Sequence, residues 1–209
     1  IRAAGGALLA WPMDGLRLDL ERLSVVLRPG DTVLITNPHN PTGQVIEGER
    51  LARLLWAHPE VAFVVDEAFA DYAPEARVPP ALLARPRTVL LQSLTKFFGM
   101  PGLRIGHAMA DPITAQRMRE LQPSWPIGQL ELRAAEVALD DEDYVQRSLA
   151  CFREDRAGFE RELRGIGWNP LPSGAPFFLV PIPTSAERWA ERLRHEGLLV
   201  RTCTHWEGL

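Results

Sequence analysis

The 209-residue sequence has one lysine, two cysteines and no long hydrophobic run. No apolar stretch approaches the roughly 18 residues that a membrane-spanning helix needs, so we predict no membrane span. Cys151 and Cys203 are too few for a disulfide framework in a chain of this length, which favours a reducing cytoplasm. The net charge of −4 offers no basic face for nucleic acid or anionic membranes. The five histidines show no metal-ligand spacing, and we predict no metal site.

The scarcity of lysine directs attention to the one that is present. The 23 basic residues comprise 22 arginines and a single lysine, Lys96. Codon usage that favours arginine explains the imbalance, yet the chain has kept one amine. An arginine side chain does not lose its proton usefully, whereas a lysine can become a neutral nucleophile. Lys96 is therefore the first candidate for a catalytic residue.

Apolar strand patterns and helix patterns alternate along the first 125 residues. Strands are expected at residues 32–36, 61–65, 88–92 and 105–109, and helices at 18–27, 49–56 and 111–122. This alternation predicts an α/β fold with a mainly parallel sheet. We expect a large domain over residues 1–125.

The pattern changes after residue 125. Helices are expected at residues 129–139 and 141–165, and a third begins at Ser185 and ends at Gly197. Strands are expected at residues 177–182 and 198–201. We therefore expect residues 126–209 to form a connecting helix and a smaller α+β domain.

Several polar residues follow the predicted strands, where parallel sheets bind their ligands. Asn40 follows the first strand, Asp66 ends the second, and Ser93 and Lys96 follow the third. The hydroxyl and backbone N–H groups around Ser93 can hold a phosphate, and Arg104 adds a guanidinium fork for it. A carboxylate, a phosphate cradle and a lone amine together suit pyridoxal 5'-phosphate, whose aldehyde binds an amine and whose ring nitrogen a carboxylate keeps protonated.

Three motifs carry a resemblance to a known family. They are NPHNPTG at residues 37–43, DEAFADY at 66–72 and SLTKFFGMPGLRIG at 93–106. In this order and spacing they resemble the fold-type-I pyridoxal-phosphate enzymes of the class I/II aminotransferase superfamily. The resemblance implies a three-layer large domain with a mainly parallel sheet, and a smaller C-terminal α+β domain. It also implies a homodimer whose active sites form between the two subunits.

The resemblance also assigns roles to individual residues. Lys96 would hold the cofactor covalently, and Asp66 would pair with the pyridine nitrogen. Asn40 would hydrogen-bond the phenolic oxygen of the cofactor. Ser93 and Arg104 would bind the cofactor phosphate.

Two groups within the superfamily compete as the best match. Phe69, where tyrosine is common, and the stretches 95–104 and 200–209 look more like threonine-phosphate decarboxylases of cobalamin biosynthesis, which is the preferred interpretation. Histidinol-phosphate aminotransferases are the alternative. Both groups use a substrate with a phosphate ester, and the resemblance implies that Arg201 binds that phosphate, with Asn40 also on the substrate side. A third interpretation is a cofactor-sensing domain of a regulator, which would need a basic DNA-binding segment outside these residues.

The sequence departs from the family pattern on the substrate side. Gly128 and Pro176 each stand where an asparagine is usual. The chain begins at Ile1 and ends at Leu209 without two expected family elements. These are a glycine-rich loop behind the cofactor phosphate and an arginine for the substrate carboxylate. We therefore expect a fragment that lacks both ends.

Overall fold

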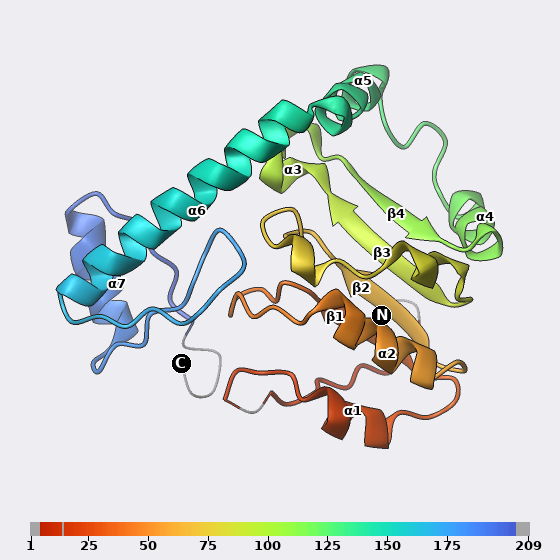
Figure 1. Ribbon diagram of the computed structural model, residues 1–209, viewed down its shortest axis with the longest axis horizontal. Helices are drawn as coiled ribbons and strands as arrows, with labels where there is room; N and C mark the ends of the chain where they lie inside the picture. Colours follow the sequence, from red (N-terminus) through yellow and green to blue (C-terminus); the bar gives the residue numbers. More distant parts are fainter. Residues whose placement is uncertain (1–4, 14, 204–209) are drawn as a thin grey trace.

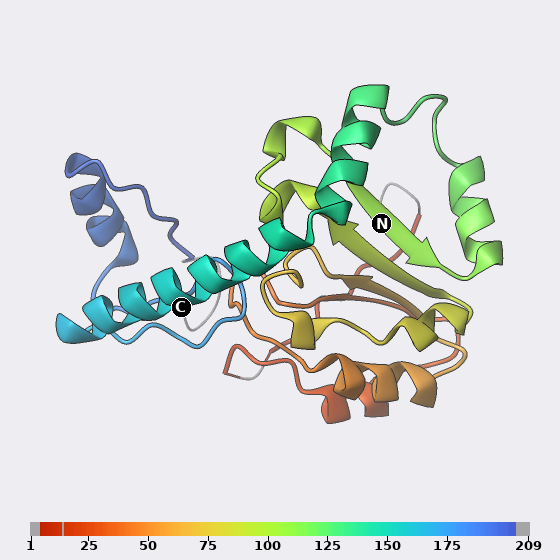
Figure 2. The same ribbon diagram turned by 45° about the horizontal axis from the view of Figure 1, so that its top comes forward.

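The computed structural model describes residues 5–13 and 15–203. A sheet with helices beside it forms one unit, and the long helix α6 leads away from it to a second unit that contains α7 (Figures 1 and 2). Within the described ranges, no helix combines the length and the apolar character needed to cross a membrane.

The sheet has four strands in the order β1, β2, β3, β4. They span β1 (Thr32–Thr36), β2 (Ala62–Asp66), β3 (Thr88–Ser93) and β4 (Gly106–Ala110). The first three are parallel, and β4 runs antiparallel to β3. The predicted α/β fold with a mainly parallel sheet is confirmed, and each strand lies within one residue of its expected position.

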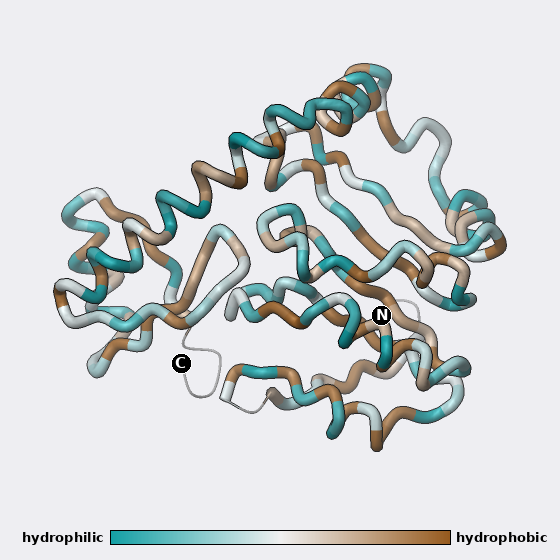
Figure 3. Tube along the Cα trace, viewed as in Figure 1, coloured by the Kyte–Doolittle hydropathy of each residue, from teal (hydrophilic) through white to brown (hydrophobic). Residues whose placement is uncertain are grey.

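One face of the sheet is covered by α1 (Leu20–Val26), α2 (Gly48–Ala57) and the 3-10 helix η3 (Pro80–Ala84). Figure 3 shows hydrophobic residues concentrated along the strands. Burying one large apolar side chain contributes about 2 kcal/mol, so this layer holds most of the stability. The core side chains include Leu20, Leu23, Ile35, Leu51, Leu54, Leu55, Phe63, Val65, Leu82 and Leu90.

The opposite face of the sheet is partly open. Leu34, at the centre of β1, is 60% exposed, and Val64 and Leu91 are only half-buried. Within the described residues, α1, α2 and η3 pack on one face of the sheet, and the face that carries Leu34 stays partly open.

A buried arginine fastens the ends of several elements together. Arg85 is 2% exposed. Its guanidinium donates to the carbonyl oxygens of Leu55 at 2.9 Å and Val61 at 2.9 Å, to that of His58, and to the Thr88 hydroxyl at 2.9 Å. These acceptors lie at the carboxyl end of α2, where the helix dipole favours a cation, and at the starts of β2 and β3. No carboxylate pairs with Arg85 in the described part of the chain, so carbonyl dipoles stabilise its charge.

The remaining helices connect the sheet to the second unit. Short helices follow β2 and β3, namely η2 (Pro74–Ala76), α3 (Leu94–Phe97) and η4 (Pro101–Leu103). Beyond β4 lie α4 (Pro112–Glu120), α5 (Gln129–Asp140), α6 (Glu142–Gly165) and α7 (Ala186–His195). Side chains cap two of these helices, since Asp111 accepts from Ile113 N and Ser185 accepts from Arg188 N.

The prediction of two strands near the C-terminus is wrong. Residues 177–182 and 198–201 belong to no strand in the structure. Both stretches line the same cavity, together with α6 and α7, and no ladder of hydrogen bonds joins them. An extended apolar segment becomes a strand only beside a partner. The described residues of the second unit are therefore helical and irregular rather than α+β.

Candidate active site

Three of the predicted site residues, Asp66, Ser93 and Lys96, lie at one edge of the sheet. In the register, Thr36 pairs with Asp66 and Asp66 with Leu91, so β1, β2 and β3 end side by side. Asp66 is the last residue of β2, and Ser93 is the last of β3 (Figure 1). The topology thus brings these residues to the carboxyl edge, as the sequence predicts.

Lys96 lies on a short polar chain at this edge. Its Nζ donates to Thr95 Oγ1 at 3.0 Å, and that oxygen lies 2.8 Å from Ser93 Oγ. Thr95 is buried, whereas Lys96 is exposed. The amine is therefore held by one hydrogen bond and is open to a ligand. Sequence reasoning missed Thr95, although it lies between two residues that were singled out.

Asp66 is half-buried and only partly engaged. Its Oδ1 accepts from Ala68 N at 2.9 Å, and its Oδ2 has no hydrogen bond within residues 5–13 and 15–203. The Oδ2 oxygen can therefore accept a hydrogen bond from a protonated ring nitrogen. An open amine can bind the aldehyde of pyridoxal 5'-phosphate, and an available carboxylate oxygen can accept a hydrogen bond from its ring nitrogen, so these residues fit that cofactor.

The neighbouring Glu67 has a different role. It is buried, and its Oε1 accepts from Val78 N at 2.8 Å while its Oε2 accepts from Gln92 Nε2 at 2.9 Å. Burial raises the pKa of Glu67, although these hydrogen bonds oppose the shift. Gln92 directly precedes Ser93, so Glu67 ties the end of β2 to the end of β3.

The two asparagines of the first motif behave differently. Asn37 is fully buried, donates through Nδ2 to Ile46 O at 2.7 Å and to Ala76 O at 2.8 Å, and is structural. Asn40 is exposed and lines a cavity beside α6 and α7. The following turn fits closely, because a Cβ at Gly43 would lie 1.9 Å from Ser173 Oγ. Asn40 is therefore the one positioned to meet a ligand.

Arg104 lies between η4 and β4 with left-handed backbone angles, φ 49° and ψ 43°. Its guanidinium is exposed, with Nη1 3.4 Å from the carbonyl oxygen of Pro101. Gly106 then enters β4 beside Ser93, and a Cβ there would lie 2.5 Å from the carbonyl oxygen of Gln92. Glycine thus lets this loop approach the end of β3 closely.

A cavity of about 1080 Å³ lies between α6, α7 and the two extended C-terminal stretches. Asn40 and Arg201 both line it, as does Phe177, whose ring packs edge-on against Phe69 at 4.9 Å. Arg201 is exposed and follows an irregular stretch instead of ending a strand. Lys96 and the other residues of the sheet edge do not line this cavity. The structure therefore brings Arg201 to the same cavity as Asn40, and not to the sheet edge that carries Asp66, Ser93 and Lys96.

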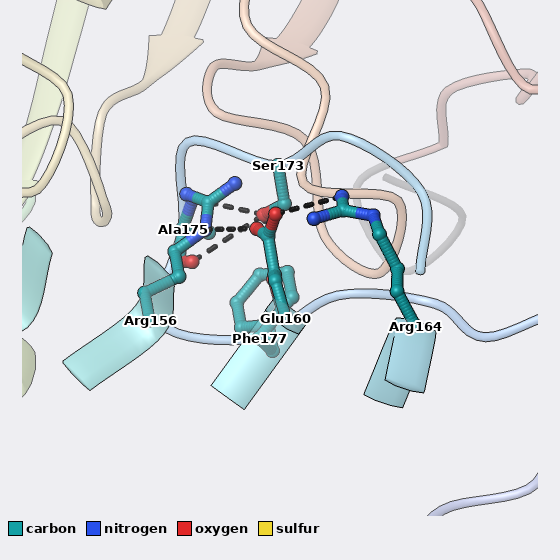
Figure 4. A network of polar contacts seen from close by, with 6 residues as sticks. All are labelled: Arg156, Glu160, Arg164, Ser173, Ala175 and Phe177. Carbon is teal, nitrogen blue, oxygen red and sulfur yellow. Dashed lines mark hydrogen bonds and ion pairs between the residues drawn. The ribbon is translucent and has the colours of Figure 1, made fainter. Parts of the chain in front are cut away.

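A carboxylate on α6 lies close to the loop that meets Gly43 (Figure 4). Glu160 is 17% exposed and accepts from Arg156 Nε at 2.9 Å and Arg164 Nη2 at 3.0 Å, each four residues away (Figure 4). Nearby, Ser173 Oγ accepts from Ala175 N at 3.0 Å. Burial raises the pKa of Glu160, but the two arginines outweigh it and lower the pKa below its usual 4.5.

We expect the Glu160 ion pairs to stabilise the fold in a pH-dependent way. Because the folded-state pKa is lowered, the contribution is present above pH 4.5 and is lost as the pH falls through the folded-state value. Glu160→Gln should therefore lower the free energy of unfolding by about 0.5 kcal/mol at neutral pH and by less in acid. Urea unfolding at several pH values measures this. Glu162→Gln, on the same helix and without an ion pair among the described residues, is the control, and equal pH dependence in both variants would contradict the prediction.

The fold and the sheet edge define a class of protein. The chain belongs to the class I and II aminotransferase family, whose sequence profile matches residues 1–207. The resemblance stated from the motifs is thereby confirmed.

Within this family, the chain is similar to several histidinol-phosphate aminotransferases. Histidinol-phosphate aminotransferase 1 of Nitrosococcus oceani is 34% identical over 200 residues, which cover 93% of this chain and 54% of the relative. The histidinol-phosphate aminotransferase of Methanopyrus kandleri is 30% identical over 95% of this chain and 51% of its own length. The chain thus spans about half the length of the curated relatives it matches.

Solved structures give the same fold. Histidinol-phosphate aminotransferase from Sinorhizobium meliloti, in complex with pyridoxal-5'-phosphate, matches with a TM-score of 0.85 and 29% identity over 95% of this chain and 56% of that one. L-threonine-O-3-phosphate decarboxylase from Porphyromonas gingivalis matches with a TM-score of 0.75 and 26% identity, over 86% of this chain and 56% of that one. The stretch 200–209 resembles that of the decarboxylases, and its residues 204–209 lie outside the described part of the chain.

Proposed function

We propose that the protein is a pyridoxal-phosphate-dependent aminotransferase that acts on an amine carrying a phosphate ester, as histidinol phosphate does. The observation that carries this proposal is the position of the only lysine. The Lys96 amine is open to a ligand and hydrogen-bonded to Thr95 at the sheet edge where β2 ends in Asp66. Family membership and the complex of the Sinorhizobium meliloti relative with pyridoxal-5'-phosphate support the choice of cofactor.

Each residue of the sheet edge has a place in holding the cofactor. Lys96 would bind its aldehyde carbon covalently, and Asp66 would pair with its ring nitrogen through the available oxygen. Ser93 and Arg104 would bind the phosphate, and Asn40 would donate to the phenolic oxygen. Thr95 joins the Ser93 and Lys96 side chains through its hydroxyl, which lies within hydrogen-bond distance of both.

When bound, pyridoxal 5'-phosphate supplies an electron-withdrawing ring that weakens a bond at the substrate Cα. The negative charge of Asp66 would keep a proton on the ring nitrogen. The free Lys96 amine would act as the general base for the proton at the substrate Cα. Thr95 holds that amine by a hydrogen bond from Nζ. Arg201, at the cavity that also reaches Asn40, would bind the phosphate ester of the substrate.

Decarboxylation of threonine phosphate is the second candidate. Phe69 favours it by resemblance, because the aminotransferases more usually carry a tyrosine at this position, and here no phenol hydroxyl is offered to the cofactor. The structural similarity to the Porphyromonas gingivalis decarboxylase also supports it. The curated relatives reported above are histidinol-phosphate aminotransferases, so the preference for a decarboxylase drawn from the motifs is not supported by them. The two reactions differ in which bond at Cα is broken.

A substrate comparison separates the two candidates. The protein is loaded with pyridoxal 5'-phosphate, and each substrate is then added separately. Histidinol phosphate with 2-oxoglutarate should yield glutamate, whereas threonine phosphate should release no carbon dioxide. Carbon dioxide release from threonine phosphate, without glutamate formation, would reverse the choice between them. If neither substrate reacts while Lys96 carries a borohydride-reducible adduct, the substrate assignment fails and the cofactor assignment stands.

A further inference from the structure

The sequence contains two tyrosines, and both hydroxyls bind the same short helix. Tyr72 Oη donates to the carbonyl oxygen of Lys96 at 3.2 Å, and Tyr144 Oη donates to that of Phe97 at 3.0 Å. These are consecutive carbonyls at the end of α3. Tyr72 comes from the loop after β2, whereas Tyr144 comes from the first turns of α6. Two separate elements thus reach the peptide that carries the lysine.

The helix needs such donors because it is very short. α3 spans only Leu94–Phe97, so its carbonyls largely lack the partners that a longer helix would provide. Within the backbone, the Lys96 carbonyl also accepts from Gly99 N at 3.3 Å, a long hydrogen bond. A four-residue helix is not stable by itself. Its position therefore depends on contacts from neighbouring elements.

The two tyrosine rings are themselves fixed by aromatic packing. Tyr72 meets Phe97 edge-on at 5.1 Å and Phe152 at 4.9 Å. Tyr144 stacks on Phe98 at 5.7 Å and meets Phe97 at 6.1 Å. Packed rings lose little further freedom when their hydroxyls bond. Burial raises the pKa of Tyr72, so its hydroxyl keeps its proton and remains a donor.

We propose that Tyr72 and Tyr144 are positioning residues that fix the Lys96 amine through the carbonyl oxygens at the end of α3. The inference rests on the proposed role of Lys96 in binding the cofactor. It adds that α6, through Tyr144, helps to determine where the amine lies. Both hydroxyls bind backbone carbonyl oxygens, so their effect on the amine would be transmitted by the backbone of residues 96 and 97.

Tyr72→Phe, Tyr144→Phe and the double variant test the proposal, because phenylalanine keeps the ring and removes only the hydroxyl. Phe152→Leu is the matched control, since it weakens packing against Tyr72 and leaves both hydroxyls. Two quantities are measured on the full chain: amide hydrogen exchange of residues 97–100 without cofactor, and the rate at which pyridoxal 5'-phosphate forms a borohydride-reducible adduct on Lys96. Each lost hydrogen bond should change both about fivefold, with faster exchange and slower adduct formation. The double variant should show a larger effect than either single variant, and because both rings pack on Phe97 the two effects should not simply multiply.

The outcomes are distinct. Wild-type exchange and adduct rates in all tyrosine variants would overturn the proposal, as would faster exchange with an unchanged adduct rate. Equal effects in Phe152→Leu would also overturn it, because lost packing would then suffice. If the wild-type chain forms no adduct, the proposed function fails instead. Exchange then decides whether the hydroxyls fix α3, and unchanged exchange rejects the inference.

Discussion

Lys96→Ala is expected to abolish the reducible adduct with pyridoxal 5'-phosphate and to lower turnover by at least about a thousandfold, because it removes both the covalent anchor and the general base. The sequence has no other lysine side chain that could replace it. Absorbance of the loaded protein, followed by borohydride reduction and peptide mapping, measures the loss. Because Lys96 is exposed, the free energy of unfolding should change little.

Lys96→Arg is the matched variant for this result. It keeps a positive charge and a donor for Thr95, but a guanidinium does not act as the amine nucleophile. We expect it to resemble Lys96→Ala in adduct formation and turnover. An unchanged visible spectrum or unchanged turnover in either variant would show that another group binds the cofactor.

Arg85→Met is expected to lower the free energy of unfolding by about 3–5 kcal/mol, because it leaves several buried carbonyl oxygens without a donor. A neutral side chain of similar length fills the space but cannot satisfy the carbonyls of Leu55, His58 and Val61. Arg85→Lys should fall between wild type and Arg85→Met, since an ammonium has fewer donors. Urea denaturation at neutral pH gives the values.

Arg87→Met is the control for this prediction. Arg87 is exposed, and its Nη1 reaches only the carbonyl oxygen of Glu60, at 3.3 Å. Its replacement should change the free energy of unfolding by no more than about 0.5 kcal/mol. Similar unfolding midpoints for the two methionine variants would contradict the role assigned to Arg85.

The sheet and its polar edge could be predicted because they depend on local patterns. Apolar runs alternating with helices indicate parallel strands, and parallel strands bring residues that follow them to one edge. Asp66, Ser93 and Lys96 therefore lie where the sequence predicts. Their roles toward a cofactor remain proposals that the experiments above address.

The features that were missed depend on contacts between distant segments. Tyr72 and Tyr144 lie 24 and 47 residues from the carbonyls they bind. In the sequence, Arg85 cannot be told apart from the other 21 arginines, because its burial depends on α2, β2 and β3 packing around it. The error at residues 177–182 has the same origin, because an extended apolar pattern does not reveal whether a neighbouring strand is present.

The strands β2 and β3 separate two kinds of substitution by position. Arg85 joins their starts, whereas Asp66 and Ser93 lie at their opposite ends. Changes near Arg85 should reduce how much folded protein a cell accumulates while leaving the activity per folded molecule unchanged. Changes at the other ends should do the reverse. In a library of variants scored for both abundance and activity, the two kinds of effect should therefore fall at opposite ends of these strands, which are five and six residues long.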